Sequence, residues 1–93
     1  MIVGTLTLHI FIPWSHSLKE KRMVLRSVTQ KVRNKYNVSI AEIEDQDLHQ
    51  SLMLGICCVS NERNHAVDML QKITTYVESI TEAEVVESQI EVL

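Results

Sequence analysis

Hydrophobic residues recur with two different periods along this chain, and the order of those periods restricts what it can fold into. Residues 2–12 alternate as expected of a strand with one apolar face, which would carry Gly4, Leu6, Leu8, Ile10 and Ile12. After Pro13 the steps become three, four and seven residues, which predicts an amphipathic helix to about Tyr36. Ser17 and Glu20 have the spacing of a capping box, in which each side chain bonds the other residue's backbone amide.

The remaining segments repeat the two patterns. Residues 38–44 and 52–59 are predicted to be strands joined by a polar connection over 44–50. A second helix is expected after Asn61, its predicted N-cap, with an apolar stripe of Ala66, Leu70, Ile73, Val77 and Ile80. Residues 82–93 should form a last strand that turns Val86, Ile90 and Val92 inward.

The resulting order, β-α-β-β-α-β, predicts an α+β fold. We expect a ferredoxin-like sandwich in which two helices cover one face of a four-stranded antiparallel sheet. Strands 2–12 and 52–59 would be central, and residues 1–93 would form a single domain. Charges at sheet edges oppose pairing with other chains, and the predicted edge strands carry Glu42, Glu44, Glu87 and Glu91.

Cysteine usage and the start of the chain favour the cytoplasm. Cys57 and Cys58 are the only cysteines, and adjacent strand residues point to opposite faces, so no disulfide is expected. Residues 2–6 contain no basic segment of the kind that opens a secretory signal. No stretch approaches the roughly 18 apolar residues of a membrane span, so we expect no membrane association.

Charge is distributed unevenly, although the net charge is only −3. Residues 14–36 contain seven Lys or Arg and one acid, Glu20, for a net of +6. The rest of the chain contains two basic and eleven acidic residues, for a net of −9. At 100° per helical residue, four of the cations fall within an arc of about 60°: Lys19, Arg22, Arg26 and Arg33.

This row of cations allows three interpretations. A row of guanidinium groups matches the spacing of phosphates along a nucleic-acid backbone, so RNA or a ribosomal surface is a candidate partner. An acidic protein partner would suit the row as well, and a merely solvated helix face would explain it without any partner. Solvated helix faces usually carry both basic and acidic residues, whereas this helix has almost no acids, which favours a functional role for the row.

The sheet face away from the predicted helices is a second candidate site. It is half apolar, and an uncovered apolar face is commonly buried by self-association, which predicts a homodimer. The expected interface comprises Val3, His9, Phe11, Met53, Cys57 and Val59. RNA-recognition domains stack bases on aromatic residues of the same two strands, but residues 53–57 contain no aromatic, so stacking is not expected.

Signals for catalysis or metal binding are weak. Asp45, Asp47 and His49 alternate in the polar connection, where a turn is a simpler interpretation than a metal site. Cys57 with His9 across from it would suit a reactive thiol, but two half-buried residues of a packed face explain the pattern better. The chain has no glycine-rich phosphate loop and no hydrolase motif, so we expect no enzyme activity, no cofactor and no metal.

The whole chain resembles the YlxP-like family of small bacterial proteins, a family of unknown function. The resemblance rests on Ser17-Leu18-Lys19-Glu20-Lys21-Arg22, the most specific segment, and on Asn37-Val38-Ser39, Ala41-Glu42, Gln46-Asp47-Leu48, Gly55 and Ile90-Glu91-Val92-Leu93. It implies a ferredoxin-like fold, no established catalytic residues, and a gene neighbourhood of translation-initiation and ribosome-maturation factors. With the charge pattern, it predicts a non-enzymatic RNA- or ribosome-associated accessory protein. The alternative is a homodimeric protein-interaction module.

Overall fold

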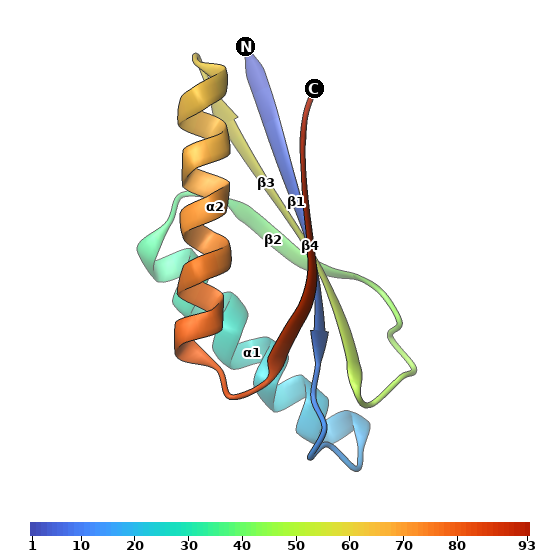
Figure 1. Ribbon diagram of the computed structural model, residues 1–93. Helices are drawn as coiled ribbons and strands as arrows, with labels where there is room; N and C mark the ends of the chain where they lie inside the picture. The colour runs from blue at the N-terminus through green and yellow to red at the C-terminus, as the bar shows by residue number, and fades with distance from the viewer.

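The computed structural model describes residues 1–93, and its elements follow the predicted order (Figure 1). They are β1 (Ile2–Phe11), α1 (Leu18–Lys35), β2 (Ser39–Glu44), β3 (Ser51–Ser60), α2 (Arg63–Ile80) and β4 (Glu84–Val92). The two hydrophobic periods therefore identified every helix and strand, and the differences are confined to the ends of the elements.

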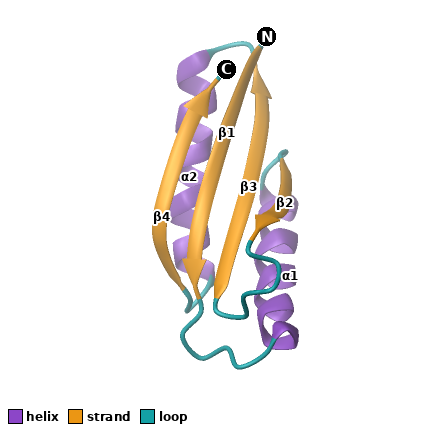
Figure 2. Cartoon of the chain, turned by 90° about the vertical axis from the view of Figure 1, so that its right-hand side faces the viewer, coloured by secondary structure: helices purple, strands orange, loops and turns teal.

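The strands form one antiparallel sheet in the order β2-β3-β1-β4, which confirms β1 and β3 as the central strands. β1 and β3 pair along their whole length, from Ile2 opposite Ser60 to Phe11 opposite Ser51. Both helices lie behind the sheet in Figure 2, and the face toward the viewer is open. This arrangement is the predicted ferredoxin-like α+β fold.

The hydrophobic core fills the space between the sheet and the helices. Most of its fully buried members come from four elements: Leu6, Leu8 and Ile10 of β1, Leu52 and Leu54 of β3, Val32 of α1, and Ala66, Leu70, Ile73 and Val77 of α2. Ile12, just after β1, is fully buried as well. Burying one such side chain stabilises the fold by about 1.5–3 kcal/mol. A one-residue slip of β1 against β3 would turn all of their core residues outward, so the register is strongly determined. Neither helix is long and apolar enough to pass through a membrane.

The start of α1 matches the predicted cap, with one change of partner. The Glu20 amide donates to Ser17 Oγ at 3.1 Å, as expected. Glu20 Oε2 accepts from the amide of His16 at 3.1 Å, however, and not from that of Ser17. The prediction for α2 is wrong by one residue, because its N-cap is Glu62, which makes no side-chain cap bond. The Glu62 amide instead donates to Ser60 Oγ, so the turn into α2 is held from β3.

A bulge in β4 overturns one predicted core position. The register between β1 and β4 shifts between His9, which is opposite Glu87, and Ile10, which is opposite Val85. Val86 is the extra residue, and it is 52% exposed, not inward as the alternation predicted. Val85 packs against the core in its place. A bulge inserts one residue into a strand, so the residues before and after it alternate in opposite phases. A single period of two, applied to the whole strand, therefore misplaces the residues on one side of the bulge.

The least expected feature of the fold is the burial of Lys21 on α1. Its side chain is 2% exposed, and its ammonium lies 2.8 Å from Glu42 Oε2. Lys21 Nζ also donates to the carbonyl oxygens of Asp45 and Leu48, at 2.5 and 2.8 Å. Glu42 Oε2 is itself buried and has no hydrogen-bond donor, so the ammonium is its electrostatic compensation. The pair joins α1 to β2 and to the connection between β2 and β3.

This ion pair corrects the sequence-based view of two residues. Lys21 was counted in the basic segment of 14–36, but it contributes no exposed charge. Glu42 was expected to protect a sheet edge, but its side chain is only 17% exposed and faces Lys21. The reason is that a buried ammonium is too costly without a counter-charge, and Glu42 is the acidic residue of β2 on the helix side.

Replacing Lys21 with methionine should lower the free energy of unfolding by about 3–5 kcal/mol, because the change strands a largely buried carboxylate and two carbonyls. Chemical denaturation measures this directly. Lys31→Met, on the exposed side of the same helix, is the control and should stay within about 0.5 kcal/mol of the wild type. A loss below about 1 kcal/mol for Lys21→Met would contradict the structural role assigned to the pair.

Candidate nucleic-acid interface on the first helix

The four predicted cations, Lys19, Arg22, Arg26 and Arg33, are all exposed on α1. We call them the basic row. They lie beside the stripe formed by Val28 and Val32, which is buried against the sheet. Arg33 Nη2 donates to the carbonyl of Ile40 in β2 at 2.9 Å, which shows that the row flanks the β2 edge of the sheet. The helical spacing therefore placed these residues together, as predicted.

No member of the basic row is paired with an acid. The ion pairs of the chain are Lys21–Glu42 and Lys72–Asp68, and neither includes a residue of the row. An unpaired guanidinium keeps its donors for a partner, and a row of them concentrates positive potential on one flank. The row is therefore electrostatically available.

Arg33 differs from the other three members. Its bond to Ile40 satisfies a backbone carbonyl of the edge strand, so part of its donor capacity is used within the fold. Lys35, which lies on the other side of α1 from the row, is 4.4 Å from the ring centroid of Tyr76 and is also engaged internally. Lys19, Arg22 and Arg26 are the members of the basic row with no internal partner.

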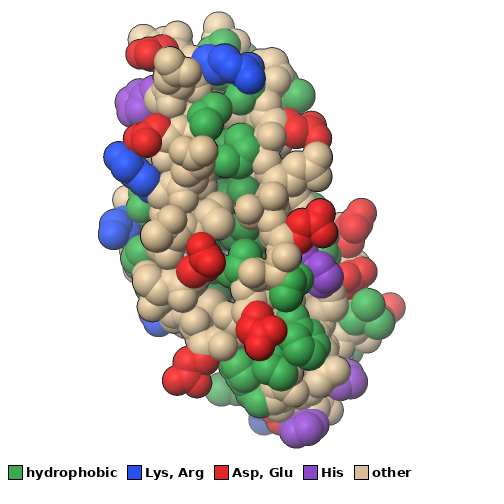
Figure 3. Space-filling view, viewed as in Figure 1, with side chains coloured by type: hydrophobic (Ala, Val, Ile, Leu, Met, Phe, Trp, Pro, Cys, Tyr) green, Lys and Arg blue, Asp and Glu red, His purple; other side chains and the backbone are tan.

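Acidic side chains lie on β2, α2 and β4, and β4 carries the largest set. Glu84, Glu87 and Glu91 are exposed on β4, which is the edge strand opposite β2. In Figure 3, which is viewed as Figure 1, acidic side chains extend across the middle and right of the molecule, and at the upper and left margins they lie among Lys and Arg side chains. The β4 edge is therefore acidic, while the β2 edge beside the basic row carries the exposed Glu44 at its end.

The open sheet face contains all six residues of the predicted dimer interface. Across the β1–β3 pair, Val3 is opposite Val59 and His9 is opposite Met53, while Phe11 and Cys57 are opposite Ser51 and Thr5. Val59 is 65% exposed and Phe11 37% exposed. The apolar members gather at the two ends of the strand pair, because the centre of β1 presents Thr5 and Thr7.

A polar chain on this face was not foreseen. His9 Nε2 lies 2.9 Å from Ser51 Oγ, and Ser51 Oγ donates to Asp45 Oδ2 at 2.7 Å. Because the serine proton points to the carboxylate, His9 cannot act as its base, and the arrangement is not that of a nucleophilic serine. Asp45 has a φ of 59°, and its side chain helps hold this turn. His9 and Ser51 are 42 residues apart, so no sequence spacing could have indicated their contact.

The structure separates the residues of the proposed thiol site. Cys57 is opposite Thr5, and His9 is opposite Met53, so the predicted cross-strand neighbours are four residues apart along β1. This separation is about 13 Å. The turn interpretation of residues 45–49 is favoured by the Asp45–Ser51 bond and by the Leu48 amide, which donates to the Asp45 carbonyl at 3.0 Å. No three His, Cys, Asp or Glu side chains lie together as a metal site.

Fold and site together define a small α+β protein with a ferredoxin-like sheet and a basic helix flank. The chain belongs to the family described as "Protein of unknown function (DUF503)", whose model matches residues 3–90. It is 44% identical over 68 residues to the uncharacterized protein YlxP of Bacillus subtilis (strain 168). This alignment covers 73% of the present chain and 74% of the relative. The resemblance inferred from the short segments is confirmed.

The titration of the Cys58 thiol tests how well this side chain is packed between the sheet and the helices. The residue is 3% exposed, and burial raises the pKa of its thiol above 9.0. The thiol therefore ionises at a lower pH in the unfolded chain than in the folded protein. The contribution of Cys58 to the free energy of unfolding is intact below pH 9.0 and is lost as the pH rises through the pKa of the folded state. The free energy of unfolding should fall more steeply above this pH in the wild type than in Cys58→Ala, by up to about 1.4 kcal/mol per pH unit.

Denaturant titrations between neutral pH and pH 10 measure the difference in slope. Cys57→Ser is the control, since this residue is half-buried on the open face and should retain the wild-type slope. Equal slopes for the wild type and Cys58→Ala would show that the Cys58 thiol is not protected from solvent in the folded state.

Proposed function

We propose that the protein is a non-enzymatic accessory factor that binds RNA, or an RNA surface of the ribosome, through the basic row of α1. One observation carries the proposal: the exposed cations on this flank have no acidic partner, while Glu84, Glu87 and Glu91 are exposed on the opposite edge strand, β4. Phosphate contacts supply most of the affinity of proteins for nucleic acids.

Charge segregation also bears on how RNA would approach. The acidic residues of β4 would repel a phosphate backbone, whereas Lys19, Arg22 and Arg26 attract it. RNA would therefore meet the protein along the basic row of α1. Phe11 is the only Phe, Tyr or Trp of the sheet, which is too few for a platform of stacked bases, so recognition would rest on the backbone and shape of the RNA.

Binding through the row should depend strongly on salt. Three phosphate contacts on single-stranded RNA, from the cations without internal partners, give a slope of log affinity against log salt of about −2.1. Raising the salt concentration from about 50 to 200 mM should weaken binding roughly 20-fold. Arg22→Glu/Arg26→Glu should abolish binding in fluorescence anisotropy with labelled RNA and prevent cosedimentation with ribosomal subunits.

The matched control is Lys31→Glu/Arg63→Glu, which changes the net charge equally but lies outside the row. Lys31 is on another side of α1, and Arg63 is at the start of α2. The control should retain most of the affinity. An acidic protein partner would also respond to salt, but nuclease treatment would not release it. Undiminished RNA or ribosome binding by the folded Arg22→Glu/Arg26→Glu variant would rule out the row as the binding site.

A homodimer through the open sheet face is the second candidate. Its support is the exposure of Val59 and Phe11 at opposite ends of the uncovered β1–β3 pair. Ile43 adds a further apolar side chain to this face, since it lies directly over Gly55. Covering these side chains with a second copy would remove them from water without using α1.

Light scattering at micromolar concentration should then give twice the monomer mass. Phe11→Glu/Val59→Glu should return the protein to a monomer, because the change buries two uncompensated charges in the interface. Val86→Glu, at the exposed β4 bulge, is the control and should leave the mass unchanged. A wild-type monomer at high concentration would exclude this candidate.

A further inference from the structure

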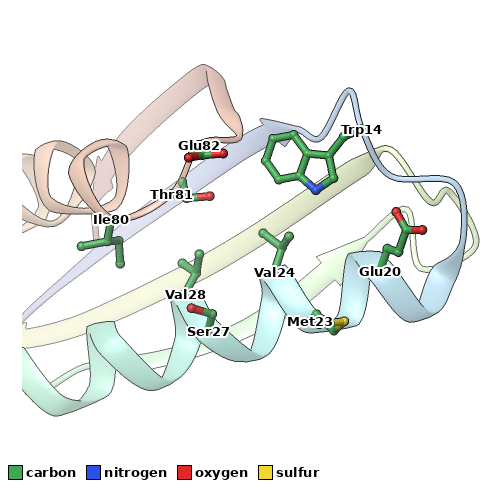
Figure 4. A pocket seen from close by; sticks show the side chains of 9 residues that line it. All are labelled: Trp14, Glu20, Met23, Val24, Ser27, Val28, Ile80, Thr81 and Glu82. Atoms are coloured by element: carbon green, nitrogen blue, oxygen red, sulfur yellow. The ribbon is translucent and has the colours of Figure 1, made fainter.

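A groove of about 450 Å³ lies between the start of α1 and the end of α2, away from the basic row. Its apolar wall is formed by Trp14, Met23, Val24, Val28 and Ile80. Figure 4 shows Val24 and Val28 pointing from α1 into the groove, with the indole of Trp14 opposite them on the segment after β1. The volume is typical of ligand sites, which span about 300–1,000 Å³.

Two large apolar side chains at the groove are exposed to solvent. Trp14, the single tryptophan, is 42% exposed, and Met23 is 62% exposed. Tryptophan and methionine are enriched at protein interfaces, tryptophan because it dominates binding energy and methionine because its side chain adapts to its partner. Both lie at the groove, although neither is needed to close the core.

Two carboxylates give the groove a definite charge. Glu20 and Glu82 line it together with Trp14, and they lie on either side of the indole in Figure 4. Neither forms an ion pair, and none of the nine lining residues is a Lys or Arg. Glu20 Oε2 accepts a bond from the His16 amide, which fixes this carboxylate while Oε1 stays free. A tryptophan face beside unpaired carboxylates is a favourable environment for an organic cation.

We propose that this groove binds a basic, amphipathic peptide segment of a partner protein. An Arg or Lys of the segment would lie against Trp14 between Glu20 and Glu82, and a large apolar side chain next to it would fill the space over Val24 and Val28. The match is one of charge and polarity: a simple inorganic cation would leave the apolar wall wet, and a nucleic acid would meet two carboxylates.

The groove and the basic row are separate surfaces of one helix. At 100° per residue, the groove-lining positions of α1 are centred roughly 140° from the row. The proposal therefore does not depend on RNA binding. Arg22→Glu/Arg26→Glu should leave the peptide affinity within about twofold of the wild type. The test of peptide binding is therefore separate from the test of RNA binding.

The experiment is a selection from a random library of 12-residue peptides displayed on phage, with depletion on the Trp14→Ala variant. We expect enriched sequences with net positive charge and at least one large apolar residue. Enriched peptides are then synthesised with a fluorescent label, and their affinity is measured by anisotropy. The emission of Trp14 gives a second readout, because it is the only tryptophan and should shift to shorter wavelength when the groove fills.

Variants of the groove define the expected result. Trp14→Ala should lower the affinity for the peptides about 30-fold. Glu20→Gln/Glu82→Gln should lower it about 5–10-fold, and glutamine at position 20 can still serve the helix cap. Glu78→Gln/Glu84→Gln removes the same charge from exposed positions outside the groove and should have less than a twofold effect. Thermal melts confirm that each variant is folded.

Several outcomes would overturn the proposal. These are the absence of any Trp14-dependent peptide, enrichment of acidic peptides, and equal effects of the two Glu→Gln pairs. Arginine amide binding as tightly as the peptides would mean a small-cation site instead. Displacement of the peptide by single-stranded RNA in the Arg22→Glu/Arg26→Glu variant would mean a nucleic-acid site, and a Trp14-dependent increase in mass would mean that a second copy of this chain is the occupant.

Discussion

The ammonium group of Lys21 is buried between α1 and the connection from β2 to β3, and the placement of α1 depends on it. Glu42 supplies the opposite charge, and the carbonyls of Asp45 and Leu48 accept its hydrogen bonds. β2 is the shortest strand and an edge strand, so it has few other means of attachment. The same turn is held from its other side, where Asp45 Oδ2 accepts from Ser51. One cation thus connects the helix layer to the least supported part of the sheet.

This arrangement leaves α1 with two exposed flanks of different character. The flank toward β2 carries the basic row, and the flank toward α2 borders the groove with Trp14, Glu20 and Glu82. Glu20 is the only acid on α1, and no Lys or Arg stands three or four residues from it, the spacings at which helical ion pairs form. Glu20 and the basic row therefore stay unpaired within the chain. The two proposals made above would give α1 one partner on each flank.

Much of the fold and part of the candidate site followed from periodicity. The alternation in β1 and β3, the helical stripes and the position of Ser17 gave the element order, the central strands and the start of α1. The spacing of Lys19, Arg22, Arg26 and Arg33 also placed them on one flank. The burial of Lys21 was within reach of the same reasoning, since it falls at the centre of the apolar stripe between Val28 and Val32 on the helical wheel.

The sequence by itself determined which residues share a face of each helix and strand, because those periods are properties of the local backbone. Only the tertiary structure decided the partners across elements: Lys21 with Glu42, His9 with Ser51, and Trp14 with Glu82 around one groove. It also decided the β4 bulge that exposes Val86. These features depend on how strands register and where helix ends meet, and contacts between distant segments leave no period in the sequence. Burial then restricts which of these contacts can form, because an ammonium or carboxylate removed from water must have an opposite charge or a hydrogen-bond partner.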